Sequence, residues 1–149
     1  MVNMFLNAIT EALHAEFGEG YEIHTEDVPQ GLVPPCFLIS MISSNRDKQT
    51  HVTYRQAVLF AVQYFPSSED NYRNEIHQVI GRLDECLETI DVTWAEKKTK
   101  ETRVYTTDVS ITDQGVLSYI IRVEDVYFRT ESGDLMESIE PAGIEVRNG

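Results

Sequence analysis

Histidine and cysteine are the residues that most often bind metals or act as nucleophiles, and this chain has few of either. Its histidines are His14, His24, His51 and His77. No HxH or HExxH spacing joins them, so we expect surface or capping histidines rather than metal ligands. The two cysteines, Cys36 and Cys86, are too few for a disulfide framework or a four-cysteine zinc site. We expect both to be small buried residues of a protein kept in a reducing compartment.

Paired carboxylates, which general acid–base catalysis uses, occur four times. The pairs are Glu26-Asp27, Glu69-Asp70, Asp84-Glu85 and Glu124-Asp125. Asp84, Glu88 and Asp91 also have the spacing of one acidic stripe on a helix. With 25 acidic residues in a chain of 149, such groupings arise readily by chance, and a solvated face is the better interpretation. The chain also lacks a GxSxG elbow and a glycine-rich phosphate loop. The sequence therefore predicts no enzyme, no catalytic residue, no metal and no cofactor.

The charge balance excludes several classes of partner. Twelve Lys and Arg stand against 25 Asp and Glu, a net charge of −13. A protein whose affinity comes from neutralising phosphates has a basic excess instead, so we expect neither sequence-specific nucleic-acid binding nor membrane binding. The basic residues Lys97, Lys98, Lys100 and Arg103 are interrupted by acids and indicate a charged connection. The N-terminus lacks a basic segment before an apolar run, which predicts a cytoplasmic protein.

The first half of the chain predicts a helix followed by a hairpin. Apolar residues at three- and four-residue steps predict an amphipathic helix from Val2 to Phe17, ended by Gly18. Residues 26–35 hold three prolines and a glycine and predict a shaped loop. Cys36–Ile42 then has the pattern of a buried strand, and its polar continuation Ser43–Gln49 that of a hairpin end. The alternation from Val52 to Phe65 predicts the return strand.

The second half predicts a helix and another hairpin. Ser67 or Ser68 is a candidate N-cap for a helix whose apolar spacing runs from Tyr72 to Ile90. Trp94, which follows, is either an interface anchor or a satellite core residue. After the charged connection, residues 102–112 alternate as a strand, residues 113–115 form a turn, and the last strand runs from Leu117 to about Phe128.

The helices do not alternate with the strands, and this order determines the expected fold class. The element order α-β-β-β-α-β-β predicts an α+β two-layer sandwich, with a mainly antiparallel sheet and both helices packed on one face. We expect one domain over residues 1–130. Residues 131–149 hold five acids and one basic residue, with glycine and proline breakers, and predict an acidic, flexible C-terminal tail.

Two local signatures lie between and beside the predicted helices. The first is Glu26-Asp27-Val28-Pro29-Gln30-Gly31 with Pro34-Pro35-Cys36-Phe37, and the second is Tyr64-Phe65-Pro66. Together with the helix before them and the long helix after them, these signatures resemble a family of prophage proteins grouped with tail terminators of long-tailed bacteriophages. The resemblance covers about residues 1–128. The signature positions Pro29, Gly31, Pro35, Tyr64, Phe65 and Pro66 are assigned to turns and to the end of a strand, because the family has no catalytic residues to carry over.

The resemblance implies a structural role in the virion. Tail terminators form a ring, usually a hexamer, that stops polymerisation of the tail tube and presents the surface that joins the tail to the head. The implied partners are further copies of the chain, the tail tube protein and a head–tail connector protein. The implied location is the tail or neck of the virion, and the host cytoplasm during assembly. A different connector or tail-completion protein is the alternative, and a small ligand-binding domain or enzyme is a more distant one.

Ring formation requires two different patches on each subunit. Uncovered sheet edges tend to pair with another chain, so the Ser43–Thr53 hairpin and the tail from Glu131 are the candidate contacts to neighbours. A negative lumen would repel DNA and let it pass. The resemblance also implies that the free protein is monomeric at low concentration, because such rings often need the tube end as a template.

Overall fold

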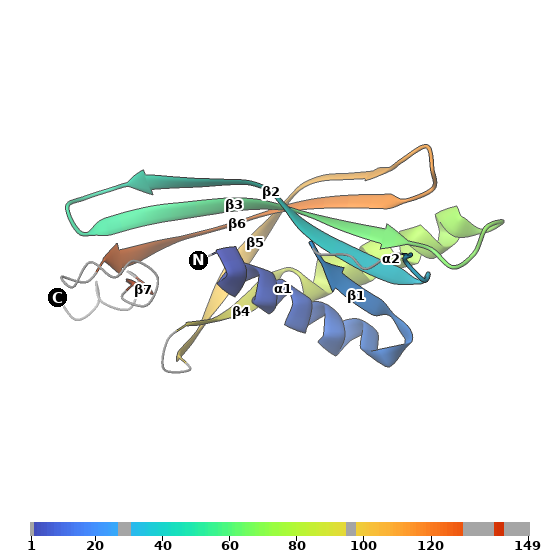
Figure 1. The fold of residues 1–149 in the computed structure, drawn as a ribbon, viewed down its shortest axis with the longest axis horizontal. Helices are drawn as coiled ribbons and strands as arrows, with labels where there is room; N and C mark the ends of the chain where they lie inside the picture. The colour runs from blue at the N-terminus through green and yellow to red at the C-terminus, as the bar shows by residue number, and fades with distance from the viewer. Residues whose placement is uncertain (1, 27–30, 95–97, 130–138, 142–149) are drawn as a thin grey trace.

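The computed structural model describes residues 2–26, 31–94, 98–129 and 139–141 (Figure 1). The elements follow in the order α1 (Val2–Phe17), the short 3₁₀ helix η1 (Gly18–Gly20), β1 (Glu22–Thr25), β2 (Cys36–Lys48), β3 (Thr53–Phe65), α2 (Tyr72–Cys86), β4 (Thr89–Trp94), β5 (Lys98–Ile111), β6 (Leu117–Arg129) and β7 (Ile139–Pro141). Strand dominates, so the expected mixed α+β class with two helices is confirmed at this level.

The strands form one sheet in the order β1-β2-β3-β6-β5-β4, and β7 pairs with β6. Only the pairing of β1 with β2 is parallel among the described strands. β5 changes partner along its length, because Lys98–Arg103 pairs with β4 and Val104–Ile111 pairs with β6. The sheet is therefore mainly antiparallel, as predicted.

The hydrophobic core is one cluster of buried residues drawn from α1, α2 and the sheet. The register places Phe37 beside Tyr64, Val62 beside Tyr119 and Tyr54 beside Tyr127, so their side chains share a face. α1 contacts this face at both ends: the rings of Phe17 and Phe37 are 4.7 Å apart, and those of Phe5 and Tyr127 6.4 Å. The predicted alternation of β3 is confirmed, because Tyr54, Val58, Phe60, Val62 and Tyr64 are all buried. The finer two-layer packing stays a prediction.

The second helix is shorter than predicted and is followed by an unpredicted strand. α2 ends at Cys86, and the backbone N–H of Leu87 donates to the Leu83 carbonyl as the cap. Thr89–Trp94 forms β4, in which Ile90, Val92 and Trp94 are buried and alternate with exposed residues. The prediction of a helix to Ile90 was wrong because Leu83, Leu87 and Ile90 also fit helical spacing. The β-branched, alternating residues that follow favour a strand. The predicted element order therefore lacks β4.

Two predicted connections are parts of strands. Ser43–Lys48, predicted as a hairpin end, continues β2, and the turn lies at residues 49–52, where the Gln49 N–H donates to the Thr53 carbonyl. Lys98, Lys100 and Arg103, predicted as a charged connection, lie in β5 and pair with β4, whereas Lys97 lies outside the described residues. Ser43–Lys48 is exposed throughout, and the basic segment of β5 is exposed in part. Polarity by itself does not distinguish such strand ends from loops.

The C-terminal segment contributes one short strand to the sheet. Ile139–Pro141 pairs with Tyr127–Arg129 of β6, and the rest of the predicted tail lies outside the described residues. The division into a domain of residues 1–130 and a tail of residues 131–149 stays a prediction. Within the part of the chain that the structure describes, no helix has the length and apolar character needed to cross a membrane.

Candidate assembly surfaces

The second signature segment lies at the end of β3 and joins it to α2. Tyr64 is buried, and its hydroxyl donates to the Glu75 carboxylate of α2 at 2.5 Å. The backbone N–H groups of Ser67 and Ser68 donate to the same carboxylate at 2.8 and 3.0 Å. Phe65 and Pro66 lie between these donors and are half-buried. The carboxylate therefore ties the strand end, the loop and the helix together.

Glu75, in the first turn of α2, binds backbone N–H groups of the loop that precedes the helix and does not cap the helix itself. The helix has Asn71 as its N-cap without a side-chain capping bond, and the Ser68 hydroxyl instead accepts the Asn71 N–H at 3.0 Å. The prediction of Ser67 or Ser68 as N-cap was therefore wrong. A carboxylate in the first turn can collect several N–H donors and is favoured there by the helix dipole.

The same contacts shift the pKa of both partners. Burial alone would raise the pKa of Glu75, but the hydrogen bonds from Tyr64, Ser67 and Ser68 stabilise its charged form and hold the pKa below its usual value. Burial, and the hydrogen bond to Glu75, raise the pKa of Tyr64. The pair is thus a neutral phenol that donates to a carboxylate throughout the neutral range.

The first signature segment shapes the entry into β2. Gly31 has a φ of 80°, in the left-handed region that favours glycine. Pro35 follows Pro34 through a cis peptide bond, and its carbonyl accepts the Glu22 N–H at 3.3 Å. Pro29 lies outside the described residues. Gly31 and Pro35 thus precede the point where β1 and β2 start to pair.

The residues singled out for metal or nucleophile chemistry do not gather into one site. His14 and His24 line a shared surface hollow with Glu19 and Glu22, and His24 lies 3.0 Å from Glu22, whereas His51 and His77 are exposed elsewhere. Among the residues with described positions, no group of three or more His, Cys, Asp or Glu side chains is placed to hold a metal ion. Cys36 is buried and Cys86 half-buried.

Burial also makes both thiols poor nucleophiles. It raises the pKa of Cys36, with a further contribution from Glu22, and it raises the pKa of Cys86 to about 11. A thiol with a raised pKa stays protonated at neutral pH and is a weak nucleophile.

The acidic stripe predicted on the second helix is wrong, because the helix ends before Glu88 and Asp91. Asp84 instead accepts a hydrogen bond from the Tyr119 hydroxyl at 2.6 Å. Burial and this bond raise the pKa of Tyr119 to about 12. Glu88 and Asp91 lie after the helix, where Asp91 is exposed on β4.

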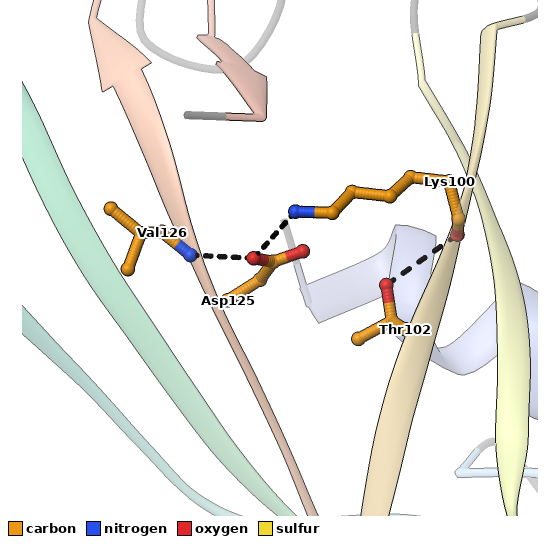
Figure 2. Close-up of polar contacts among 4 residues, drawn as sticks. All are labelled: Lys100, Thr102, Asp125 and Val126. Carbon is orange, nitrogen blue, oxygen red and sulfur yellow. Dashed lines mark hydrogen bonds and ion pairs between the residues drawn. The ribbon is translucent and has the colours of Figure 1, made fainter. Parts of the chain in front are cut away.

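A second polar cluster lies where the pairing of β5 changes from β4 to β6 (Figure 2). The Lys100 ammonium donates to Asp125 Oδ1 at 2.8 Å, and the Val126 N–H donates to the same oxygen at 2.8 Å. Thr102 is buried, and its hydroxyl donates to the Lys100 carbonyl at 3.5 Å. This ion pair connects the two strands beyond the last residue pair of their ladder, Val104 with Val123.

A family model described as phage tail terminator protein matches residues 4–134. The chain belongs to the phage tail terminator family. The match spans both signature segments and every element from α1 to β6 apart from the first two residues of α1. No curated protein matches the chain.

Membership of the tail terminator family makes the chain a structural component of the virion tail that interacts with other tail or head components. The predicted resemblance is thereby confirmed. A terminator needs protein-binding surfaces rather than a reaction centre. Two features of the described residues suit that need: a projecting hairpin and a groove.

The β2–β3 hairpin extends past α1 at one end of the sheet (Figure 1). Every residue from Met41 to Val52 is exposed, including Arg46, Asp47 and Lys48. Arg46 covers the ring of Tyr54 at 4.8 Å. A shallow groove of about 450 Å³ lies between α1 and β4, with Glu11, Glu16 and Asp91 in its lining.

Proposed function

We propose that the chain acts as a tail terminator by forming a ring that caps the tail tube and provides the surface that joins the tail to the head. The observation that carries this proposal is the match to the tail terminator family over residues 4–134. By family resemblance the ring is a hexamer, and its partners are the tail tube protein and a head–tail connector protein. We place the assembling protein in the host cytoplasm and the finished ring in the virion.

The properties of the chain support a role in assembly rather than catalysis. Its net charge of −13 suits a ring through which DNA passes without being held. We infer a domain over residues 1–130 that builds the ring and an acidic tail over residues 131–149 that contacts a neighbour. The signature residues Pro29, Gly31, Pro35, Tyr64, Phe65 and Pro66 serve the fold in this proposal rather than a contact with a partner.

Deletion of the gene from an inducible prophage tests the function by tail length. Without a terminator the tube continues to polymerise, so electron microscopy of the lysate should show overlong tails without heads. Expression of the wild-type chain from a plasmid is the control and should restore normal tails. Tails of normal length that fail to join heads would contradict the proposal and indicate a head-closure or tail-completion protein.

The binding partner is tested with purified components. Light scattering of the free chain should give a monomer at low concentration, and an oligomer should form when purified tail tubes are added. Failure of the chain to bind tube ends would contradict the terminator function.

A further inference from the structure

Within the described residues, β2 and β5 are each only partly covered by the outermost strand beside them, one on each side of the sheet. β1 covers β2 only along Cys36–Ile39, which leaves Ser40–Lys48 without an outer strand partner among the described residues. The Met41 N–H in this stretch donates to the Glu26 carboxylate at 2.7 Å, so the backbone groups open to a partner lie beyond Met41. β4 covers β5 only along Lys98–Arg103. The outer edge of Tyr105–Ile111 therefore also has no strand partner within the described ranges. An open edge presents backbone N–H and C=O groups that are suited to pairing with another strand.

Exposed apolar side chains concentrate on these two edges. Of the large apolar side chains that are exposed among the described residues, Met41 (38%) and Ile42 (49%) lie on the β2 edge, and Tyr105 (42%) and Val109 (37%) lie on the β5 edge. Val33 and Val52 are the others. Each edge also has one β-bulge, a feature that blunts edges in monomeric proteins.

The strand directions favour a head-to-tail contact between copies. β2, β3, β6 and β5 alternate in direction, so β2 and β5 run in opposite directions. If copies are related by rotation about an axis roughly parallel to the strands, β5 of one copy meets β2 of the next in antiparallel orientation. The alternation then continues across every interface.

The position of the edges suits a closed ring rather than a flat row. Ser40 of β2 pairs with Ala61 of β3, Ala61 pairs with Ile120 of β6, and Ile120 pairs with Asp108 of β5. Ser40 and Asp108 therefore lie at the same height along the strands. The open part of β2 runs from this level toward the β2–β3 turn, whereas most of the open part of β5 lies on this level or toward the β5–β6 turn. Pairing the two edges therefore staggers neighbouring copies, and closed sheets require such a stagger with tilted strands.

We propose that the open edge Ile42–Lys48 of β2 pairs in antiparallel orientation with the open edge Tyr105–Ile111 of β5 in a second copy of this chain, so that one sheet continues around the ring. This inference rests on the proposed function, which requires a ring, and adds the surfaces that form it. The contact is heterologous, with two different patches on each subunit, and can therefore close. Backbone hydrogen bonds between edges supply affinity, and the exposed apolar side chains become buried.

Engineered disulfides test the pairing. Three double variants each combine Asp108→Cys with Ser43→Cys, Ser44→Cys or Asn45→Cys. A disulfide needs Cα atoms roughly 4.4–6.8 Å apart, and testing three neighbouring positions lets at least one pair reach this distance. Each double variant is oxidised both free at high concentration and bound to tail tubes. We expect a ladder of covalent oligomers beyond the dimer from at least one double variant. All four positions are exposed. Changes at Ser43, Asn45 and Asp108 spare the core, whereas Ser44→Cys also removes the acceptor of the buried Gln56 amide, 2.6 Å away.

Three controls separate this pairing from other arrangements. The wild-type chain should give no ladder, since Cys36 is buried and Cys86 half-buried. Ser44→Cys alone and Asp108→Cys alone should give no dimers. Dimers from either single variant would indicate a two-fold contact of like edges and overturn the proposal. Tube-bound protein without a ladder in any double variant would also overturn it and indicate another occupant of the edges, while leaving the proposed function intact.

Charge insertion gives an independent measurement. Ile42→Lys and Val109→Lys each place a lysine on one edge, and each should weaken self-association by about tenfold or more, because an unpaired charge would enter a buried contact. Val33→Lys removes an exposed apolar side chain away from both edges and should leave association unchanged. An equal mixture of Ile42→Lys and Val109→Lys should form heterodimers through the one intact interface. Mixtures that stay monomeric at concentrations where the wild-type chain assembles would contradict the head-to-tail contact.

Discussion

At the scale of single residues, Glu75 is the side chain on which most of the polar contacts near the second signature converge. It accepts hydrogen bonds from the Tyr64 hydroxyl and from the backbone of Ser67 and Ser68. These donors come from the end of β3 and from the loop that leads into α2. The signature Tyr64-Phe65-Pro66 thus has a local explanation in the joining of a strand to a helix, without reference to a partner.

Tyr64→Phe removes one donor from Glu75 and leaves the ring in the core. We expect the free energy of unfolding to fall by about 1.5–3 kcal/mol, the usual contribution of a hydrogen bond to a charged group. Urea denaturation followed by circular dichroism measures it. Tyr105→Phe, on an exposed tyrosine, is the matched control and should change stability little. Equal losses in the two variants would show that the hydroxyl of Tyr64 contributes nothing specific.

Glu75 should also make stability depend on pH in the acid range. Its pKa in the folded state lies below the usual value of 4.5, so the charged carboxylate stabilises the fold fully above about pH 4.5. This contribution is lost as the pH falls from 4.5 through the lower pKa that Glu75 has in the folded state. Glu75→Gln should therefore be less stable than wild type at pH 7, and the difference should narrow at pH 3. Glu69→Gln, on an exposed acid of the same loop that accepts none of these hydrogen bonds, is the control and should be about as stable as wild type at pH 7.

At the scale of elements, the exchange of partners by β5 organises one side of the sheet. The strand pairs with β4 over its first part and with β6 over its second part, and Lys100 and Asp125 bridge the separating strands (Figure 2). The side chains of the pair are 25% and 14% exposed, so it is partly screened by solvent. Asp125 Oδ2 is buried without a hydrogen-bond partner among the described residues, which makes the carboxylate depend on Lys100.

Lys100→Met should lower the free energy of unfolding by about 1–3 kcal/mol, because it leaves a partly buried carboxylate with one backbone donor. Asp125→Asn should recover part of this loss when it is added to Lys100→Met, since the double variant no longer buries an unpaired charge. A double-mutant cycle in urea measures the coupling between the two side chains. Additive effects would show that the ion pair does not stabilise the separation of the strands.

At the scale of the whole molecule, net charge and topology together suit the proposed ring, through which DNA would pass without being bound. The net charge of −13 gives repulsion from phosphates that strengthens at low salt. The open edges on opposite sides of the sheet provide two different surfaces for neighbours.

The charge predicts that the purified chain does not bind duplex DNA even at low salt. Fluorescence anisotropy of a short labelled duplex, titrated with the chain at low ionic strength, should stay flat, because the chain has no basic excess to displace counterions. A basic DNA-binding protein in the same assay is the positive control. DNA binding that weakens as salt is added would contradict the prediction that the acidic chain repels DNA.

The sequence by itself determined the class of protein and most of its elements. Apolar periodicity is a local property, so α1, β3, β6 and the turn at residues 113–115 follow directly from the spacing of residues such as Val58, Phe60 and Val62. The signature segments, together with their order, were enough to indicate the terminator family, which the family match confirms.

Only the tertiary structure decided where neighbouring strands begin and end. Leu87 and Ile90 fit a helix and a strand equally well by spacing, and pairing with β5 places Ile90 in β4. The polar residues Ser43–Lys48 became a strand because β3 supplies backbone partners for them, a non-local contact that side-chain polarity does not encode. Glu75 likewise contacts Tyr64 only after the chain has turned through Pro66. The open edges also depend on non-local contacts, because the order of all the strands in the sheet decides which strand has an uncovered edge.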